Sequence, residues 1–202
     1  MKPLFSIVTP TVLRPSLAAT IRSIDAQSCE DWEHIIVIDM PEATAPAWDG
    51  ERRRWYVCDT AHRNAGNSCR HFIWPDIRCE LVIDLDDDDL FCDVDALALI
   101  AEGMGDAQWG IFPALRFGEA FFNGPPGINR TMCCQFVRRP VINGCYTTRF
   151  SNTNYTAEDG ILVENMMKLT PPAIIDPGFP LVRVDKQSRG ERPDGLPRIY
   201  DK

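Results

Sequence analysis

The sequence predicts an α/β fold with a mixed sheet. The N-terminal half of the sheet is parallel with helices on both faces, and a smaller antiparallel part follows toward the C-terminus. Apolar runs of strand length recur at residues 5–8, 33–39 and 80–85, and a helical pattern separates the first two. The run at 33–39 is apolar along most of its length, which is typical of a strand covered on both faces. After Gly103, strand-like segments and Gly/Pro-rich loops replace this alternation.

The N-terminal half alternates strands and helices. Residues 5–8 form the first strand, and the chain is expected to turn at Pro10, which has no N–H to donate to a central ladder. A helix then begins at Pro15 and Ser16. Further strands are predicted at 33–39, 55–58 and 80–85, and further helices at about 62–74 and 94–102. Asp93 is a candidate N-cap for the last of these helices.

The C-terminal half is less regular. Strands are predicted at 109–117, 131–138, 173–175 and 181–184. A helix is expected to begin near Thr156, which with Asp159 three residues later resembles a capping box. Residues 186–202 are charged and rich in Gly and Pro, and are expected to form a tail or a flap.

The most unusual stretch is 80–91, where a short apolar strand runs into Asp84 and then Asp86, Asp87, Asp88 and Asp89. Like charges at a strand end repel and raise one another's pKa unless a cation or hydrogen bonds hold them. Oxygen ligands of this kind suit a hard divalent ion such as Mg²⁺ or Mn²⁺, which also binds phosphates. A solvated acidic loop is the alternative. Apolar Leu90 and Phe91 favour the metal site, because they are expected to anchor the run to the core.

Three strands of the predicted sheet end in polar residues. Thr9, Pro10 and Thr11 follow the first strand, Asp39 ends the second, and Asp86 follows the fourth. Ligands of open α/β sheets bind outside the carboxyl ends of the strands. These segments are therefore expected to face one crevice.

Composition narrows the possible functions. A length of 202 residues fits one domain, and a net charge of -8 argues against a sequence-independent nucleic-acid binder, which needs a basic surface. The eight cysteines contain no Cys-x-x-Cys pair, so reduced thiols are expected and a zinc site is not. No apolar run approaches membrane-spanning length, and the first residues lead directly into a strand without a signal peptide. A cytoplasmic location is expected.

Four segments, in this order, resemble the family 2 glycosyltransferases, which have the GT-A (Rossmann-like) fold. The first comprises residues 5–11, 22–28 and 32–39. The others are Asn64-Ala65-Gly66-Asn67 with Arg70, Leu85-Asp86-Asp87-Asp88-Asp89 as the Asp-x-Asp element, and Glu158-Asp159 at a helix start. The likeness covers roughly residues 4–185. It implies a single domain over 1–202, with a nucleotide-sugar-binding half (about 1–103), an acceptor and catalytic half (about 104–185) and the 186–202 segment.

The resemblance also implies an activity: metal-dependent, inverting transfer of a sugar from a nucleoside diphosphate sugar, a UDP-sugar first of all, to a glycan or other hydroxyl acceptor. Synthesis of a surface glycan or polysaccharide is the expected setting. Mn²⁺ or Mg²⁺ would be the cofactor, with Asp88 as principal ligand beside Asp86, and Asp159 would be the catalytic base. The implied donor-binding residues are Thr9, Pro10, Thr11, Asp39, Arg63, Asn67, Arg70, Asp86 and Asp87.

The chain departs from the family pattern at two places. Met40-Pro41-Glu42 stands where many members have Asp-Gly-Ser, and the C-terminal part lacks the histidine that often completes the metal shell. Two other functions stay open, namely a sugar nucleotidyltransferase and a non-catalytic nucleotide-sugar binding module. The first would need a Gly-rich phosphate loop after strand one, where residues 9–15 contain no glycine. The second would have no use for a base at Asp159.

Overall fold

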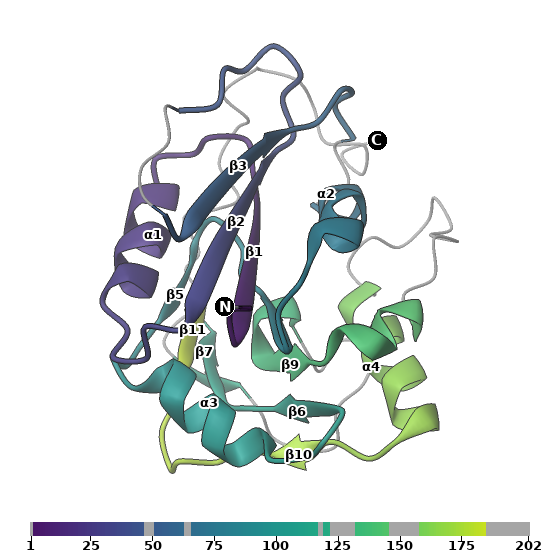
Figure 1. Cartoon of the computed structure of the whole chain (residues 1–202). Coiled ribbons are helices and arrows are strands. Elements are labelled where there is room, and N and C mark those ends of the chain that lie inside the picture. The colour runs from purple at the N-terminus through teal and green to yellow at the C-terminus, as the bar shows by residue number, and fades with distance from the viewer. Residues whose placement is uncertain are drawn as a thin grey trace.

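The computed structural model describes residues 2–46, 51–62, 66–116, 119–121, 132–145 and 158–184. Within these ranges a seven-stranded sheet forms the centre of the molecule, with the strand order β10-β6-β9-β4-β1-β2-β3 (Figure 1). Its four N-terminal strands pair in parallel, whereas β9 runs antiparallel to both β4 and β6. The strands are β1 (Phe5–Thr11), β2 (Trp32–Ile38), β3 (Arg53–Val57), β4 (Leu81–Asp84), β6 (Trp109–Ile111), β9 (Phe136–Arg138) and β10 (Ala173–Ile174).

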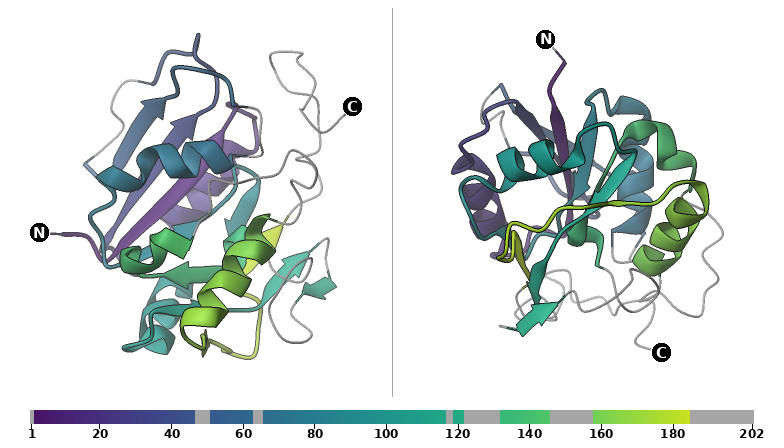
Figure 2. Two further views of the ribbon diagram at one scale, coloured as in Figure 1. Left: turned by 90° about the vertical axis from the view of Figure 1, so that its right-hand side faces the viewer. Right: turned by 90° about the horizontal axis from the view of Figure 1, so that it is seen from below.

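Helices cover both faces of this sheet. Figures 1 and 2 place α1 and α3 on one face and α2 and α4 on the other. The helices are α1 (Leu17–Asp25), α2 (Asn67–Ile73), α3 (Ala96–Met104) and α4 (Glu158–Leu169), with short 3₁₀ helices η1 (Trp74–Asp76), η2 (Cys133–Gln135) and η3 (Pro140–Cys145). The predicted parallel sheet with two covered faces is confirmed.

A second, smaller sheet has the order β5-β11-β7-β8. Its strands are β5 (Asp89–Phe91), β11 (Val182–Val184), β7 (Ala114–Arg116) and β8 (Glu119–Phe121). Pairing is antiparallel except between β11 and β7. The chain enters this sheet directly from the acidic run, because β5 begins at Asp89.

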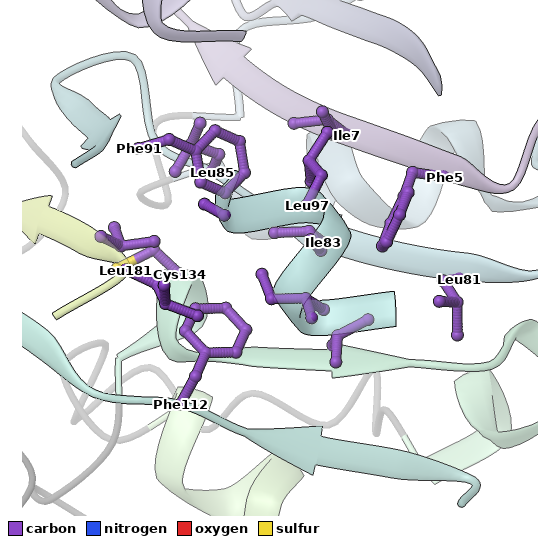
Figure 3. Packing of buried hydrophobic residues seen from close by; sticks show 14 of the residues in the cluster. Phe5, Ile7, Leu81, Ile83, Leu85, Phe91, Leu97, Phe112, Cys134 and Leu181 are labelled. Atoms are coloured by element: carbon purple, nitrogen blue, oxygen red, sulfur yellow. The ribbon is translucent and has the colours of Figure 1, made fainter. Parts of the chain in front are cut away.

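Strand alternation divides the core between the two faces of the large sheet. Ile7 and Ile83 belong to the cluster that includes residues of α1 and α3, and Figure 3 shows them packed with Leu97 of α3. Their neighbours Val8 and Val82 point the opposite way and pack with residues of α2. On the side of α4, a third cluster surrounds the buried indole of Trp109.

The structure corrects four details of the predictions. The first strand continues through Pro10 to Thr11, and its register with β2 runs to the pair Thr11↔Ile38. The carbonyl of Val8 faces β4 and that of Thr11 faces β2, so by alternation the nitrogen of Pro10 faces the β4 side. Pairing with β4 has already ended at Val8↔Asp84, and the missing N–H of Pro10 therefore costs no ladder hydrogen bond.

The other three corrections concern boundaries. Helix α3 begins at Ala96, two residues later than expected, because the Asp93 carboxylate accepts a hydrogen bond from the Asp95 backbone N–H (2.8 Å) in a turn before the helix. The predicted strand 109–117 is divided into β6 and β7, which belong to different sheets. The predicted strand 131–138 is a strand only from Phe136 onward, and η2 precedes it.

Candidate functional site

The carboxyl ends of β1, β2, β3 and β4 form one edge of the large sheet. Backbone hydrogen bonds hold them together there: Asp39 N–H donates to the Thr11 carbonyl (2.8 Å), and Cys58 N–H donates to the Ile38 carbonyl (2.9 Å). On the other side of β1, Leu85 N–H donates to the Val8 carbonyl (3.0 Å). The predicted convergence of these strand ends is therefore seen in the backbone.

The acidic run forms a tight turn between β4 and β5. Leu85 and Phe91, at its two ends, are both buried in the core, as Figure 3 shows. Asp87, Asp88 and Asp89 are buried, whereas the Asp86 side chain is 38% exposed. The run is thus a constrained turn with most of its carboxylates inside the protein, rather than a solvated acidic loop.

Asp87 is tied to the segment that follows β1. One of its carboxylate oxygens accepts a hydrogen bond from the Thr11 hydroxyl (2.7 Å), and the other pairs with the Arg14 guanidinium (3.0 Å). The Thr11 hydroxyl oxygen also accepts from the Leu13 backbone N–H (2.8 Å). This bond supports Leu13 in a left-handed backbone conformation (φ 59°), which non-glycine residues rarely adopt. The loop after β1 is therefore held in one shape against the acidic turn.

Asp86 is tied to α2. The buried guanidinium of Arg70 pairs with the Asp86 carboxylate and also donates to the side-chain oxygen of Asn67 (3.0 Å). Gly66, immediately before the helix, has φ 85°, and a Cβ added there would lie 2.3 Å from the Pro10 ring. Only glycine allows α2 to approach β1 this closely.

The carboxylates of the turn repel one another in the folded protein. Burial, together with the charges of Asp86 and Asp87, raises the pKa of Asp88 to about 7, against the opposing effect of Arg14. The pKa of Asp87 is raised mainly by burial, and that of Asp89 is raised well above its usual value by burial and by Cys134. Among the described residues, no side chain is hydrogen-bonded to Asp88. Within the described part of the chain, the negative charge of the turn is therefore only partly neutralised.

This donor set fits a hard divalent cation. Ligand atoms of Asp86, Asp89 and Cys133 lie within 4.8 Å of one another. The two carboxylates supply the oxygen ligands that Mg²⁺ and Mn²⁺ prefer, whereas a thiol is a poor ligand for them. Asp88 does not belong to this three-residue group, although it is the carboxylate of the turn whose negative charge is least balanced by contacts with described side chains.

Asp39 lies at the same edge, at the end of β2. It is buried, and one of its carboxylate oxygens accepts a hydrogen bond from the His62 backbone N–H (2.7 Å). A second group of potential ligand atoms, from Asp39, Cys58 and Cys69, also falls within 4.8 Å. The hydrogen bond from Cys69 lowers the pKa of the Cys58 thiol.

Most of the predicted site residues are thus brought to one edge. Hydrogen bonds and ion pairs connect five of them in two groups, namely Thr11 with Asp87, and Asn67 with Arg70 and Asp86. Pro10 packs on Gly66. Thr9 lies within β1, where its hydroxyl is 3.0 Å from the His34 ring. Arg63 lies outside the described residues. Asp159 occupies the first turn of α4, but its side chain and the capping partner Thr156 also lie outside what the structure describes.

Sequence reasoning missed several residues of this edge. Arg14 neutralises part of the Asp87 charge, and no sequence motif indicates this pairing. Cys133 falls within the predicted strand 131–138, but it lies in η2 at 3.5 Å from the Arg70 guanidinium. Cys58 and Cys69 are eleven positions apart, so no short-range motif reveals their contact.

The mixed seven-stranded sheet, with helices on both faces and a small second sheet, is a GT-A-like fold. Solved structures that share this fold include TarS and a mannosyltransferase, PcManGT. Among the described residues, no helix is long and apolar enough to cross a membrane.

Two solved proteins illustrate the likeness. The crystal structure of Staphylococcus aureus TarS 1-349 in complex with UDP-GlcNAc has a TM-score of 0.68 at 17% identity, over 98% of this chain and 62% of that chain. The mannosyltransferase PcManGT from Pyrobaculum calidifontis, in complex with GDP-Man and Mn²⁺, has a TM-score of 0.57 at 13% identity, over 89% of this chain and 58% of that chain. A further TarS structure matches over 36% of its length. This chain therefore spans about a third to three fifths of the solved chains it matches.

At these identities the likeness concerns the fold. No protein-family model and no curated protein matches the chain.

Proposed function

We propose that this protein is a metal-dependent, inverting glycosyltransferase of the family 2 type, which moves a sugar from a nucleoside diphosphate sugar to an acceptor hydroxyl. A UDP-sugar donor and a glycan acceptor, in the synthesis of a surface glycan or polysaccharide, complete the proposal. The observation that carries it is the buried acidic turn at the carboxyl edge of the parallel strands, tied to β1 through Thr11 and to α2 through Arg70. Such an edge is where open α/β sheets bind nucleotides.

The solved neighbours support the nature of the donor. One of them binds UDP-GlcNAc and another binds GDP-Man with Mn²⁺. Both are nucleoside diphosphate sugars, whose phosphates require positive charge. The carboxylates of the acidic turn, whose charge is only partly neutralised, would attract a divalent cation. The same cation can also bind the diphosphate of the donor.

The proposed roles follow from position and charge. Asp88 and Asp86 would hold Mn²⁺ or Mg²⁺ on one side of the diphosphate, with Asp89 close enough to contribute an oxygen. A divalent cation held there supplies the charge that stabilises a departing nucleoside diphosphate. Arg70 is already paired with Asp86, and it would fix the carboxylate while Asn67 fixes the guanidinium.

The nucleoside half of the donor is assigned to the neighbouring strand ends. Thr9, Pro10, Thr11 and Asp39 would contact the base and ribose, with Arg63 near the phosphates. The Asp39 carboxylate is positioned by the His62 backbone N–H at 2.7 Å, and the loop after Thr11 is stabilised by Asp87. A preformed loop loses less conformational entropy when the donor binds.

Asp159 is proposed as the catalytic base. An attacking hydroxyl must lose its proton as it bonds to the anomeric carbon, and a carboxylate on the side opposite the diphosphate takes that proton in an inverting transfer. Asp159 lies in the first turn of α4, on the same face of the large sheet as α2 (Figure 2).

The test separates binding from turnover. Thermal unfolding is measured with UDP, GDP and dTDP, each with and without Mn²⁺, and one nucleotide is expected to raise the melting temperature only when the metal is present. Release of nucleoside diphosphate from the matching sugar nucleotide is then measured for wild type, Asp159→Asn and Asp88→Asn. Asp159→Asn is expected to bind nucleotide and metal normally without turnover, and Asp88→Asn to lose the metal-dependent shift. Asp106→Asn, an exposed carboxylate after α3, is the matched control.

A non-catalytic nucleotide-sugar binding module is the second candidate. It is favoured by the two departures from the family pattern, namely Met40-Pro41-Glu42 after the second strand and the absence of a histidine from the C-terminal part of the sequence. A metal-dependent nucleotide shift without turnover in the wild type, for any acceptor, would support this module. Absence of any metal-dependent nucleotide shift would refute both candidates.

A further inference from the structure

Three buried side chains meet at the edge of the large sheet, outside the acidic turn. Asp39 follows β2, Cys58 follows β3, and Cys69 lies in α2, which packs against the sheet at this edge (Figure 1). Potential ligand atoms of all three lie within 4.8 Å of one another. Asp39 is 4% exposed, and the two cysteines are 1% and 0% exposed. The proposed glycosyl transfer has no use for two adjacent thiols.

The distance between the two sulfurs indicates what this group suits. The Sγ atoms of Cys58 and Cys69 are 3.6 Å apart. A disulfide would require them to approach to about 2.0 Å. Two thiolates on a tetrahedral Zn²⁺, each at about 2.3 Å from the metal, lie about 3.8 Å apart. The sulfurs therefore already have almost the spacing of a tetrahedral metal site, and the carboxylate lies beside them.

We propose that Cys58, Cys69 and Asp39 form a binding site for a thiophilic divalent cation, of which Zn²⁺ is the representative. The two sulfurs and one carboxylate oxygen are the protein ligands, and a water molecule or an incoming ligand takes the fourth position. Borderline-soft Zn²⁺ accepts this mixed set, whereas Mg²⁺ and Mn²⁺ prefer the carboxylate oxygens of the acidic turn. The two groups at this edge are thus chemically distinct.

The charge balance is acceptable for a buried site. Binding displaces one proton from each thiol to solvent, so the metal meets two thiolates and one carboxylate. The resulting complex has one net negative charge. The hydrogen bond with Cys58 and burial raise the pKa of the Cys69 thiol, and the Arg70 guanidinium opposes this rise, so it offsets part of the cost of the thiolate. Asp39 retains the hydrogen bond from the His62 backbone N–H, a second contact that orients the carboxylate.

Two consequences follow from the position of the three ligands. A bound ion would connect the ends of β2 and β3 to α2 and so stabilise the folded protein by mass action. It would also occupy the carboxylate that the proposed donor site assigns to the nucleoside, so Zn²⁺ and the donor are expected to compete. The metal site itself does not depend on the proposed activity, because its ligands are present whether or not the protein transfers a sugar.

The site is tested with Co²⁺, which replaces Zn²⁺ and has visible absorption that reports tetrahedral geometry and thiolate ligation. The reduced protein is titrated as wild type, Cys58→Ser, Cys69→Ser and Asp39→Asn. Cys79→Ser is the matched control, because Cys79 is buried in the same core cluster but lies outside the ligand group. Wild type and Cys79→Ser are expected to bind one Co²⁺ with thiolate-to-metal charge-transfer absorption.

The variants have different expected outcomes. Loss of an outer-shell partner alone weakens metal binding about 10- to 100-fold, so loss of either thiolate should weaken Co²⁺ binding at least that much. Asp39→Asn should keep the thiolate absorption but bind more weakly. The proposal is overturned if wild type shows no charge-transfer absorption, or if both serine variants retain it at wild-type strength, which would assign the metal to other thiols.

A measurement on the wild type tests the site even if the variants fail to fold. X-ray absorption of the protein loaded with one equivalent of Zn²⁺ is expected to show two sulfur ligands and two oxygen or nitrogen ligands. A shell with no sulfur or one sulfur would refute the site. Failure of the proposed function has a different signature, namely absent nucleotide binding with an intact two-sulfur zinc shell.

Discussion

The acidic turn makes a quantitative prediction about Asp88→Asn. Burial and the neighbouring carboxylates raise the pKa of Asp88 from 3.8 to about 7 in the folded protein. Because the folded-state pKa is raised, the folded protein binds more protons than the unfolded chain between these two values. The destabilising contribution of Asp88 is therefore absent at low pH and grows as the pH rises toward 7.

The size of the effect follows from the pKa. Each unit corresponds to about 1.4 kcal/mol, so the two units between about pH 5 and the folded-state pKa give a change of about 3 kcal/mol. Without metal, the free energy of unfolding of Asp88→Asn relative to wild type is thus expected to increase by about 3 kcal/mol between about pH 5 and pH 8. The comparison with wild type isolates Asp88, because buried His34 produces an opposing pH dependence in both proteins.

The assay is urea unfolding in EDTA at several pH values, repeated with saturating Mn²⁺. Asp106→Asn, an exposed carboxylate, serves as the control and should follow the wild type throughout. Mn²⁺ is expected to raise the free energy of unfolding of the wild type, most strongly at high pH. It should therefore reduce or reverse the difference in stability between Asp88→Asn and the wild type. A stability difference that does not change with pH, or a variant less stable than wild type at about pH 8 without metal, would refute the electrostatic account of the turn.

Three further predictions concern the scaffold around this edge. Gly66→Ala forces a Cβ to 2.3 Å from the Pro10 ring at a φ of 85°, and should lower the free energy of unfolding by about 1–3 kcal/mol in urea unfolding. Arg138→Met leaves the fully buried Asp84 without its 2.7 Å ion pair, and should cost about 3–5 kcal/mol, part of which Asp84→Asn in the same protein restores. Burial lowers the pKa of His34 from 6.5 to about 3, so its stabilising contribution is present above pH 6.5 and is lost as the pH falls toward 3. In His34→Gln, acid unfolding should therefore show a smaller loss of stability over this pH range.

The parallel half of the fold could be predicted from the sequence because each strand there carries its own local signal. The run at β2 is apolar on both faces, and Leu17 and Ile24 repeat at helical spacing, so hydrophobic pattern alone predicts both elements. The C-terminal half was predicted less well. Strands β5, β7 and β11 are three residues long, and their existence depends on partners distant in the sequence, which local pattern does not contain.

The candidate site follows the same division. Asp39, Asp86 and Asp88 could be placed at this edge from the sequence because they follow the predicted strands, and the ends of parallel strands meet at one edge of the sheet. The interactions of Arg14 with Asp87 could not, because an arginine three residues beyond a strand has many conformations open to it. The Cys58–Cys69 contact depends on how α2 packs against the sheet, which no spacing rule specifies.

The position of the acidic turn between the two sheets gives it a mechanical role as well. Asp84 ends a strand of the large sheet, and Asp89 begins β5, which pairs with β11 at Val184. An ion bound by the carboxylates between them would make the turn that connects β4 to the small sheet more rigid. Slower amide exchange along β5 and β11 after addition of Mn²⁺ would then indicate, from the small sheet, that the acidic turn has bound the ion.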